Sequence, residues 1–196
     1  EGEEKILLAA WSAVLAAQPR AVMVLAPRHP DRFAAVAAMV EASAFTLVRA
    51  SEFRERPAPV RAGSIFLLDT IGDLAAVYSL GAAAFVGGSL VPSGGHNPLE
   101  PARFGVPVLM GPSFENFREI VEVLLAHRAI RIVSVDEFAE TLVEFVHPID
   151  GNRIHRIDEV QAMGERGREV FEAQAGATGR TVRALTALLE ERAVSG

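Results

Sequence analysis

The stretch AAAFVGGSLVPSGGHNPLEPARFGVPVLM, residues 82–110, decides the fold. A short apolar run, Ala83–Val86, leads into a glycine-rich loop, Gly87–His96. Asn97–Phe104 has the composition of a helix, and Pro107–Met110 is a second short apolar run. Apolar runs of this length on either side of a helix predict a β-α-β unit whose two parallel strands are buried in a sheet.

The same alternation extends along the chain in both directions. We expect further strands at Ala21–Ala26, Phe45–Val48, Ile65–Leu68 and Ile130–Val133. We expect further helices at Glu3–Ala17, Pro30–Ala42, Asp73–Leu80, Asn116–His127, Val135–Val146, Arg153–Ala175 and Thr178–Ala193. The polar, proline-containing segment Ser51–Gly63 predicts a loop. Short apolar strands separated by helices predict an α/β fold with one doubly wound parallel sheet. Residues 1–196 would then be a single Rossmann-like domain with a helical C-terminal segment.

Composition excludes several classes of function. The 196 residues carry 25 acidic and 19 basic side chains, a net charge of −6, and no cysteine. Such a chain lacks the excess cations that a general nucleic-acid binder needs. Without cysteine, disulfides, iron–sulfur clusters and thiolate zinc sites are excluded. The five histidines show no metal-ligand spacing, so we expect no bound metal. The uncharged stretch Leu74–Leu99 holds too many glycines and prolines for a transmembrane helix.

Three strand ends carry polar or glycine-rich residues, at the edge of the sheet where ligands of such folds bind. They are Pro27–Pro30 (PRHP), Asp69–Asp73 (DTIGD) and Gly87–Pro101. In the second segment Asp69 and Asp73 flank a helix start. Capping of the helix by Asp73 is favoured there over magnesium binding.

The glycine-rich loop predicts an anion site. Gly88 lets a ligand approach the backbone, and Gly94 and Gly95 can present free N–H groups. Asn97 predicts a cap for the following helix, whose positive end would lie beside the loop. A phosphate suits such a site, although the loop lacks the Lys-Ser/Thr pair of a P-loop and the spacing of the dinucleotide motif. A simple turn at the two adjacent glycines is the alternative.

Glu100 has two interpretations. Asn97-x-x-Glu100 matches a capping box, in which the glutamate accepts a hydrogen bond from the Asn97 amide. The other interpretation makes Glu100 a ligand-binding residue. The same spacing recurs at Asn116–Glu119 and Ser134–Glu137, where we expect caps alone.

Basic side chains near the strand ends also have two interpretations each. Arg28 could bind an anionic group of a ligand, either a phosphate or a carboxylate. The alternative for Arg28 is a salt bridge to Asp31. For His29 the two interpretations are a ligand contact and a cap on the next helix. For His96 the two interpretations are a hydrogen bond donated to an anion and packing within the loop.

Together these motifs resemble the 3-deoxy-D-manno-octulosonic acid (Kdo) transferases of lipopolysaccharide synthesis. GGSLVPSGGHNPLEPARFGVPVLMGPSFENFREI, Gly87–Ile120, is similar to the family's motif. PRHPDRF at Pro27–Phe33 and DTIGDL at Asp69–Leu74 match in order and separation. The opening EGEE resembles the end of the family's Ser-Thr-His-Glu-Gly-Glu segment. The resemblance covers nearly the whole chain and the C-terminal half of the family's architecture.

The resemblance implies a GT-B glycosyltransferase, in which two Rossmann-like domains face each other across a cleft. This chain would be the C-terminal domain, which binds the sugar nucleotide CMP-Kdo without a metal or other cofactor. The absent N-terminal domain would carry the membrane-associating segment, the site for the lipid A precursor (lipid IVA) and the general base. The whole enzyme would act at the cytoplasmic face of the bacterial inner membrane. The present chain would be soluble, bind the donor and not turn over.

The resemblance also implies roles for individual residues. Arg28 would contact the phosphate or the Kdo carboxylate, and Glu100 would accept hydrogen bonds from the ribose. The residues implied to line the rest of the CMP site are Gly88, Ser89, Gly94, Gly95 and Asn97. Those implied less directly, around the base or the anion, are His29, Asp69, Thr70, Ile71, Gly72 and His96.

Two other functions fit the same residues. One is the donor domain of a UDP-sugar-dependent GT-B transferase or epimerase, which would share the ribose and phosphate contacts. The other is a noncatalytic Rossmann-like module that binds a partner protein. A preference for CMP, for UMP or for no nucleotide separates the three functions.

Overall fold

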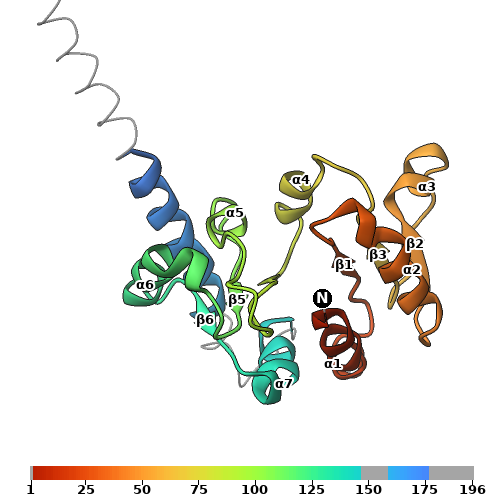
Figure 1. The fold of residues 1–196 in the computed structure, drawn as a ribbon, viewed down its shortest axis with the longest axis horizontal. Helices are drawn as coiled ribbons and strands as arrows, with labels where there is room; N and C mark the ends of the chain where they lie inside the picture. The colour runs from red at the N-terminus through yellow and green to blue at the C-terminus, as the bar shows by residue number, and fades with distance from the viewer. Residues whose placement is uncertain (1, 147–158, 177–196) are drawn as a thin grey trace, which may run out of the picture.

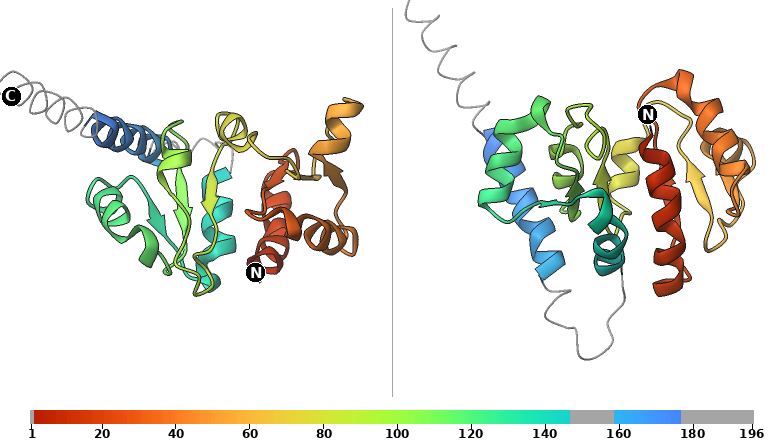
Figure 2. Two further views of the ribbon diagram at one scale, coloured as in Figure 1. Left: turned by 45° about the horizontal axis from the view of Figure 1, so that its top comes forward. Right: turned by 60° about the horizontal axis from the view of Figure 1, so that its bottom comes forward.

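The computed structural model describes residues 2–146 and 159–176, which form an α/β structure (Figures 1 and 2). Its strands are β1 (Met23–Leu25), β2 (Leu47–Arg49), β3 (Ile65–Leu67), β4 (Ala84–Val86), β5 (Val108–Met110) and β6 (Arg131–Ile132). Its labelled α-helices are α1 (Glu3–Ala17), α2 (Phe33–Glu41), α3 (Ala50–Glu55), α4 (Leu74–Tyr78), α5 (Leu99–Ala102), α6 (Arg118–Ala126) and α7 (Val135–Val146). Two 3₁₀ turns, η1 (Pro30–Arg32) and η2 (Glu115–Phe117), precede α2 and α6. Residues 159–176 are also helical.

The strands form two three-stranded parallel sheets, in the orders β1-β3-β2 and β4-β5-β6. The expectation of one continuous sheet was therefore wrong, although the strands expected from the sequence are present and parallel. Each strand pairs over three residues or fewer, so the hydrogen-bonded ladders are short. Val24 on β1 is 41% exposed, unlike a strand in the middle of a covered sheet. The face of β1 that carries Val24 is therefore incompletely covered.

Helix α1 links the two sheets. Its residues Trp11 and Val14 pack with β1, β3 and α2, while Ala10 packs with Leu109 of β5 and with α7. Leu7 contacts both of these apolar clusters. Figure 1 shows the start of α1 between the two sheets, and the right-hand view of Figure 2 shows the helix running along their junction. Leu142 of α7 also belongs to both clusters, so the position of one sheet relative to the other depends on α1 and α7 together.

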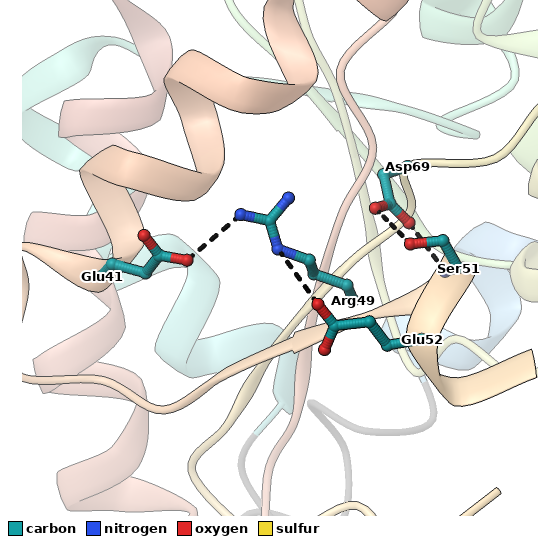
Figure 3. A network of polar contacts seen from close by, with 5 residues as sticks. All are labelled: Glu41, Arg49, Ser51, Glu52 and Asp69. Carbon is teal, nitrogen blue, oxygen red and sulfur yellow. Dashed lines mark hydrogen bonds and ion pairs between the residues drawn. The ribbon is translucent and has the colours of Figure 1, made fainter. Parts of the chain in front are cut away.

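Helix α3 occupies the start of Ser51–Gly63, where a loop was expected. The carboxylate of Asp69 accepts hydrogen bonds from the Ser51 amide (2.8 Å) and the Ser51 hydroxyl (2.7 Å), which caps the helix (Figure 3). Arg49 contacts Glu41 (3.1 Å) and Glu52 (3.7 Å) in the same network. The cap comes from a residue 18 positions away, so no local sequence signal marks it.

The remaining helices agree more closely with the sequence. The bounds of α1 and α7 are those expected, and the helix expected at Pro30–Ala42 divides into η1 and α2. The helix expected at Arg153–Ala175 is present where residues 159–176 are described. The start of that helix and the helix expected at Thr178–Ala193 lie outside the described residues. Among the described helices, none has both the length and the apolar composition to cross a membrane.

Replacing Leu109 with alanine tests how much the second sheet depends on its buried centre. Leu109 is fully buried in β5, so Leu109→Ala should lower the free energy of unfolding by about 2–5 kcal/mol. The matched control is Leu80→Ala, because Leu80 is 85% exposed and its loss should cost less than about 0.5 kcal/mol. Urea unfolding of both variants measures the difference. Equal losses would contradict the packing described here.

Candidate functional site

The loop after β4 is held by the carboxylate of Glu3, at the start of α1. The Gly88 amide donates to Oε2 of Glu3 (2.5 Å), and the amides of Ser89 and Leu90 donate to Oε1 (2.8 and 2.7 Å). The resemblance implied that the amides of Gly88 and Ser89 lie near a ligand's phosphate. Instead, a side chain of the same chain accepts their hydrogen bonds. Gly88 has φ +70°, which suits a turn that aims successive N–H groups at one acceptor.

The glycines further along the loop also have internal partners. The Gly94 amide donates to the hydroxyl of Ser113 (2.9 Å), and the Gly95 amide donates to the carbonyl of Gly88 (2.7 Å). The expectation of free amides at these positions was therefore wrong. Gly95 is buried, and a buried N–H group needs a partner. The turn interpretation of the two glycines is the one that the structure supports.

Ser89 connects the end of β4 to the loop that follows β5. Its side chain is fully buried, and its hydroxyl donates to the carbonyl of Val86 (2.6 Å) and accepts from the amide of Gly111 (2.8 Å). A Cβ on Gly111 would lie 2.2 Å from the Ser89 carbonyl oxygen, so this approach requires glycine. Ser89 thus does not line an open site, contrary to expectation.

Asn97 caps α5 as expected. Its Oδ1 accepts a hydrogen bond from the Leu99 amide (3.1 Å). The capping box with Glu100 does not form, because among the described residues Glu100 makes no hydrogen bond. Glu100 is exposed, which leaves its carboxylate accessible to a ligand.

The other two candidate capping boxes differ. In Ser134–Glu137 the Glu137 carboxylate accepts from the Ser134 amide (3.1 Å), and the Glu137 amide donates to the Ser134 hydroxyl (3.3 Å). Asn116 instead contacts the glycine-rich loop. Its backbone amide donates to the carbonyl of Gly94 (3.0 Å), and its side-chain Nδ2 donates to the carbonyl of Ser93 (3.4 Å). The cap expected there was wrong, since Asn116 lies inside η2.

Arg28 and His96 meet between the two sheets. Nη1 of Arg28 lies 3.4 Å from Nδ1 of His96, although the residues follow strands of different sheets. Burial and the Arg28 charge lower the pKa of His96, while the charges of Glu3 and Glu100 act in the opposite direction. A neutral imidazole can accept a hydrogen bond from the guanidinium. Within the described residues Arg28 forms no ion pair with Asp31, so the salt-bridge interpretation was wrong.

His29 lies beside this pair without capping η1. It occupies the N-cap position, and its side chain makes no capping hydrogen bond. Its charge is one of those that lower the pKa of His96. The three basic side chains Arg28, His29 and His96 therefore gather where the chain leaves β1 and where the loop after β4 ends. The guanidinium charge and the N–H groups of the two imidazoles suit an anionic ligand.

In the turn after β3, the polar side chains form hydrogen bonds within the chain, and one apolar side chain is exposed. The carboxylate of Asp69 accepts two hydrogen bonds from Ser51, and the hydroxyl of Thr70 donates to Asp73 (2.5 Å). Asp73 also pairs with Arg54 (2.6 Å) and makes no capping bond to α4, contrary to expectation. Ile71 is 82% exposed, so its apolar side chain is available to a flat ligand surface.

A cavity of about 260 Å³ lies beside Glu100, between α4, α5 and the helix of residues 159–176. It is lined by Ala75, Tyr78, Asn97, Leu99, Glu100, Arg103, Phe104 and Phe171. Burial and the neighbouring Glu100 charge raise the pKa of Tyr78 to about 12. The guanidinium of Arg103 lies over the rings of Phe104 (5.5 Å) and Phe171 (5.9 Å).

Sequence reasoning missed Glu3 and Tyr78. Glu3 looked like an ordinary acidic residue in the first turn of a helix, and its partners lie 85 to 87 positions away. The resemblance of the opening EGEE to the family's segment implies no role for that side chain. Tyr78 carried no motif. Among the described residues, no group of three or more histidine, aspartate or glutamate side chains is arranged to hold a metal ion.

Comparison with known proteins finds related sequences and a related solved structure. The chain is 35% identical to a 3-deoxy-D-manno-octulosonic acid transferase of Haemophilus influenzae, over 96% of this chain and 42% of that protein. It is 34% identical to the Bordetella pertussis transferase of the same name, over 94% of this chain and 42% of that protein. The chain thus spans about two fifths of the length of these relatives. No family model matches the sequence.

A solved structure has the same fold. It is the crystal structure of the C-terminal CMP-Kdo binding domain of WaaA from Acinetobacter baumannii. The TM-score is 0.71 at 28% identity, covering 85% of this chain and 83% of that chain. The expected fold, the C-terminal domain of a GT-B glycosyltransferase, is thereby confirmed.

The single tyrosine of the chain offers a test of the cavity beside Glu100. Titrating the absorbance of tyrosinate should give a midpoint near pH 12 for Tyr78, compared with 10.0 for an ordinary tyrosine. Glu100→Gln should lower the midpoint, since the Glu100 charge opposes ionisation of the phenol. Glu122→Gln on the exposed side of α6 is the control and should leave it unchanged. A midpoint near 10 in the original chain would contradict the described burial.

Proposed function

We propose that this chain, a homologue of the C-terminal part of the Kdo transferases, binds the sugar nucleotide CMP-Kdo. The observation that carries the proposal is the meeting of Arg28 and His96 at 3.4 Å, at the junction of the two sheets. Both follow the carboxyl ends of parallel strands, where nucleotides bind in folds of this kind. CMP-Kdo carries a phosphate and a carboxylate, so its anionic groups match the guanidinium of Arg28 and the ring N–H of His96.

Two side chains divide the donor between them. The exposed guanidinium of Arg28 can hold a phosphate or carboxylate through two parallel N–H bonds. The exposed carboxylate of Glu100, at the second residue of α5, can accept hydrogen bonds from two ribose hydroxyls. Ile71 offers an apolar surface to the base. Because the amides of Gly88–Leu90 are taken by Glu3, the anionic groups of the donor rely on side chains rather than on that loop's backbone.

The transfer follows from the same arrangement. A hydroxyl of the acceptor attacks the anomeric carbon of Kdo, the bond from that carbon to the phosphate oxygen breaks, and CMP leaves with its electron pair. Arg28 stabilises the negative charge that develops on the departing phosphate, so the proposal requires no divalent metal. The acceptor in our proposal is the lipid A precursor. Its binding site and the base that takes its proton belong to a part of the enzyme outside this chain. Association with the inner membrane is assigned to that part too.

Calorimetric titration with CMP, UMP, AMP, CMP-Kdo and cytidine tests the proposed function. The chain should bind CMP in preference to UMP and AMP. A preference for UMP would favour a UDP-sugar enzyme, and the absence of binding by any nucleotide would favour a module for a partner protein.

Variants of the two side chains sharpen the test. Arg28→Ala should raise the dissociation constant for CMP-Kdo about 10- to 100-fold and leave that for cytidine nearly unchanged. Glu100→Gln should weaken both ligands about tenfold, since both contain the ribose. Arg61→Ala is the control, because Arg61 is exposed and precedes β3 at the opposite end of its sheet. Equal losses of CMP-Kdo and cytidine binding in Arg28→Ala would reject the role given to Arg28.

A further inference from the structure

Glu3 is the one side chain that joins the start of α1 to the loop after β4 by several hydrogen bonds within the described residues. It is 8% exposed, and its carboxylate accepts from the amides of Gly88, Ser89 and Leu90. Both oxygens are used. A buried carboxylate with three N–H partners is well satisfied, and its loss would leave three amides without their acceptor.

The loop held in this way also places His96. The His96 amide donates to the carbonyl of Gly87 (3.1 Å), and the Gly95 amide donates to the carbonyl of Gly88. A Cβ on Gly88 would lie 3.3 Å from both Cε1 and Nε2 of His96, so the imidazole packs directly against this backbone. A shift of the turn by a few tenths of an ångström would therefore move the ring.

His96 in turn contacts Arg28. The described contacts form a continuous series from Glu3 to the Gly87–Gly88 backbone, then to the ring of His96 and the guanidinium of Arg28. A Cβ on Gly87 would lie 3.0 Å from Oε2 of Glu3, which shows how closely the carboxylate fits the turn. Glu3 belongs to the helix that packs against both sheets, so it fixes the loop relative to both.

We propose that Glu3 is a positioning residue, which holds the turn Gly87–Leu90 so that His96 and Arg28 lie correctly for an anionic nucleotide. Glu3 itself does not touch the ligand, because its oxygens are occupied by the three amides. The effect on affinity rests on the proposed function, whereas the effect on the loop does not.

The alternative is that Glu3 acts as a simple acid at a helix start, through its charge on the helix dipole. Glu4 provides the matched control. It lies in the same first turn, and its carboxylate contacts Arg32 (2.6 Å) and the Gly2 amide (3.1 Å) rather than the loop. A general effect of charge would make the two substitutions equivalent.

The test compares Glu3→Gln with Glu4→Gln in this chain. Amide resonances of Gly88, Ser89 and Leu90 should shift strongly in Glu3→Gln and little in Glu4→Gln. The pKa of His96, followed by its ring resonances, should fall in Glu3→Gln, since the Glu3 charge favours the imidazolium. Affinity for CMP should drop about tenfold in Glu3→Gln and remain within about twofold in Glu4→Gln.

A second variant guards against a simple loss of folding. Glu3→Ala leaves space for a small carboxylate, so added acetate should restore CMP binding to it in part and should have no such effect on Glu4→Gln. Unchanged loop amides and an unchanged His96 pKa in Glu3→Gln would overturn the proposal, as would equal effects in both glutamine variants. If the original chain binds no nucleotide, the proposed function fails, and the amide and His96 readouts still decide the role of Glu3.

Discussion

The hydrogen bonds from three consecutive amides to the Glu3 carboxylate are the constraint on which the arrangement of the site depends. The two sheets are not joined into one, so their relation rests on side-chain packing through α1 and α7. That packing is apolar and without direction. The carboxylate of Glu3 adds a directional contact, because three N–H groups converge on one side chain. A loop of the second sheet is thus fixed by the helix that also packs on the first.

The charges at the junction explain why an anionic ligand suits it. Arg28 and His96 lie together, and burial and Arg28 hold the imidazole toward its neutral form. A bound phosphate would favour protonation of His96 and relieve the repulsion between it and the guanidinium. Glu100, in α5 after the loop, is exposed and makes no hydrogen bond among the described residues. The site therefore combines cations for the acidic groups with a carboxylate for hydroxyls, which matches the polarity of a sugar nucleotide.

Much of this could be predicted from the sequence, because the signals were local. Apolar runs bounded by glycine and proline marked the strands, and the Ser134–Glu137 box and the Asn97 cap formed as expected. Features that depend on distant residues could not be predicted. The cap of α3 comes from Asp69, which follows the neighbouring strand β3, and the amides of the glycine-rich loop bind Glu3 rather than a ligand. A glycine-rich turn shows that N–H groups can converge, but it does not identify the acceptor.

A titration of the isotope-labelled chain with CMP, followed through its backbone amide resonances, tests the proposed site directly. The largest shifts should cluster at the carboxyl ends of the strands, around Arg28, Ile71, His96 and Glu100. The Gly88–Leu90 amides should keep their hydrogen bonds to Glu3 when the nucleotide is bound. Shifts centred at the opposite ends of the strands, near Arg61, would contradict the proposed site. Release of the Gly88–Leu90 amides from Glu3 to the phosphate would contradict the role given to Glu3.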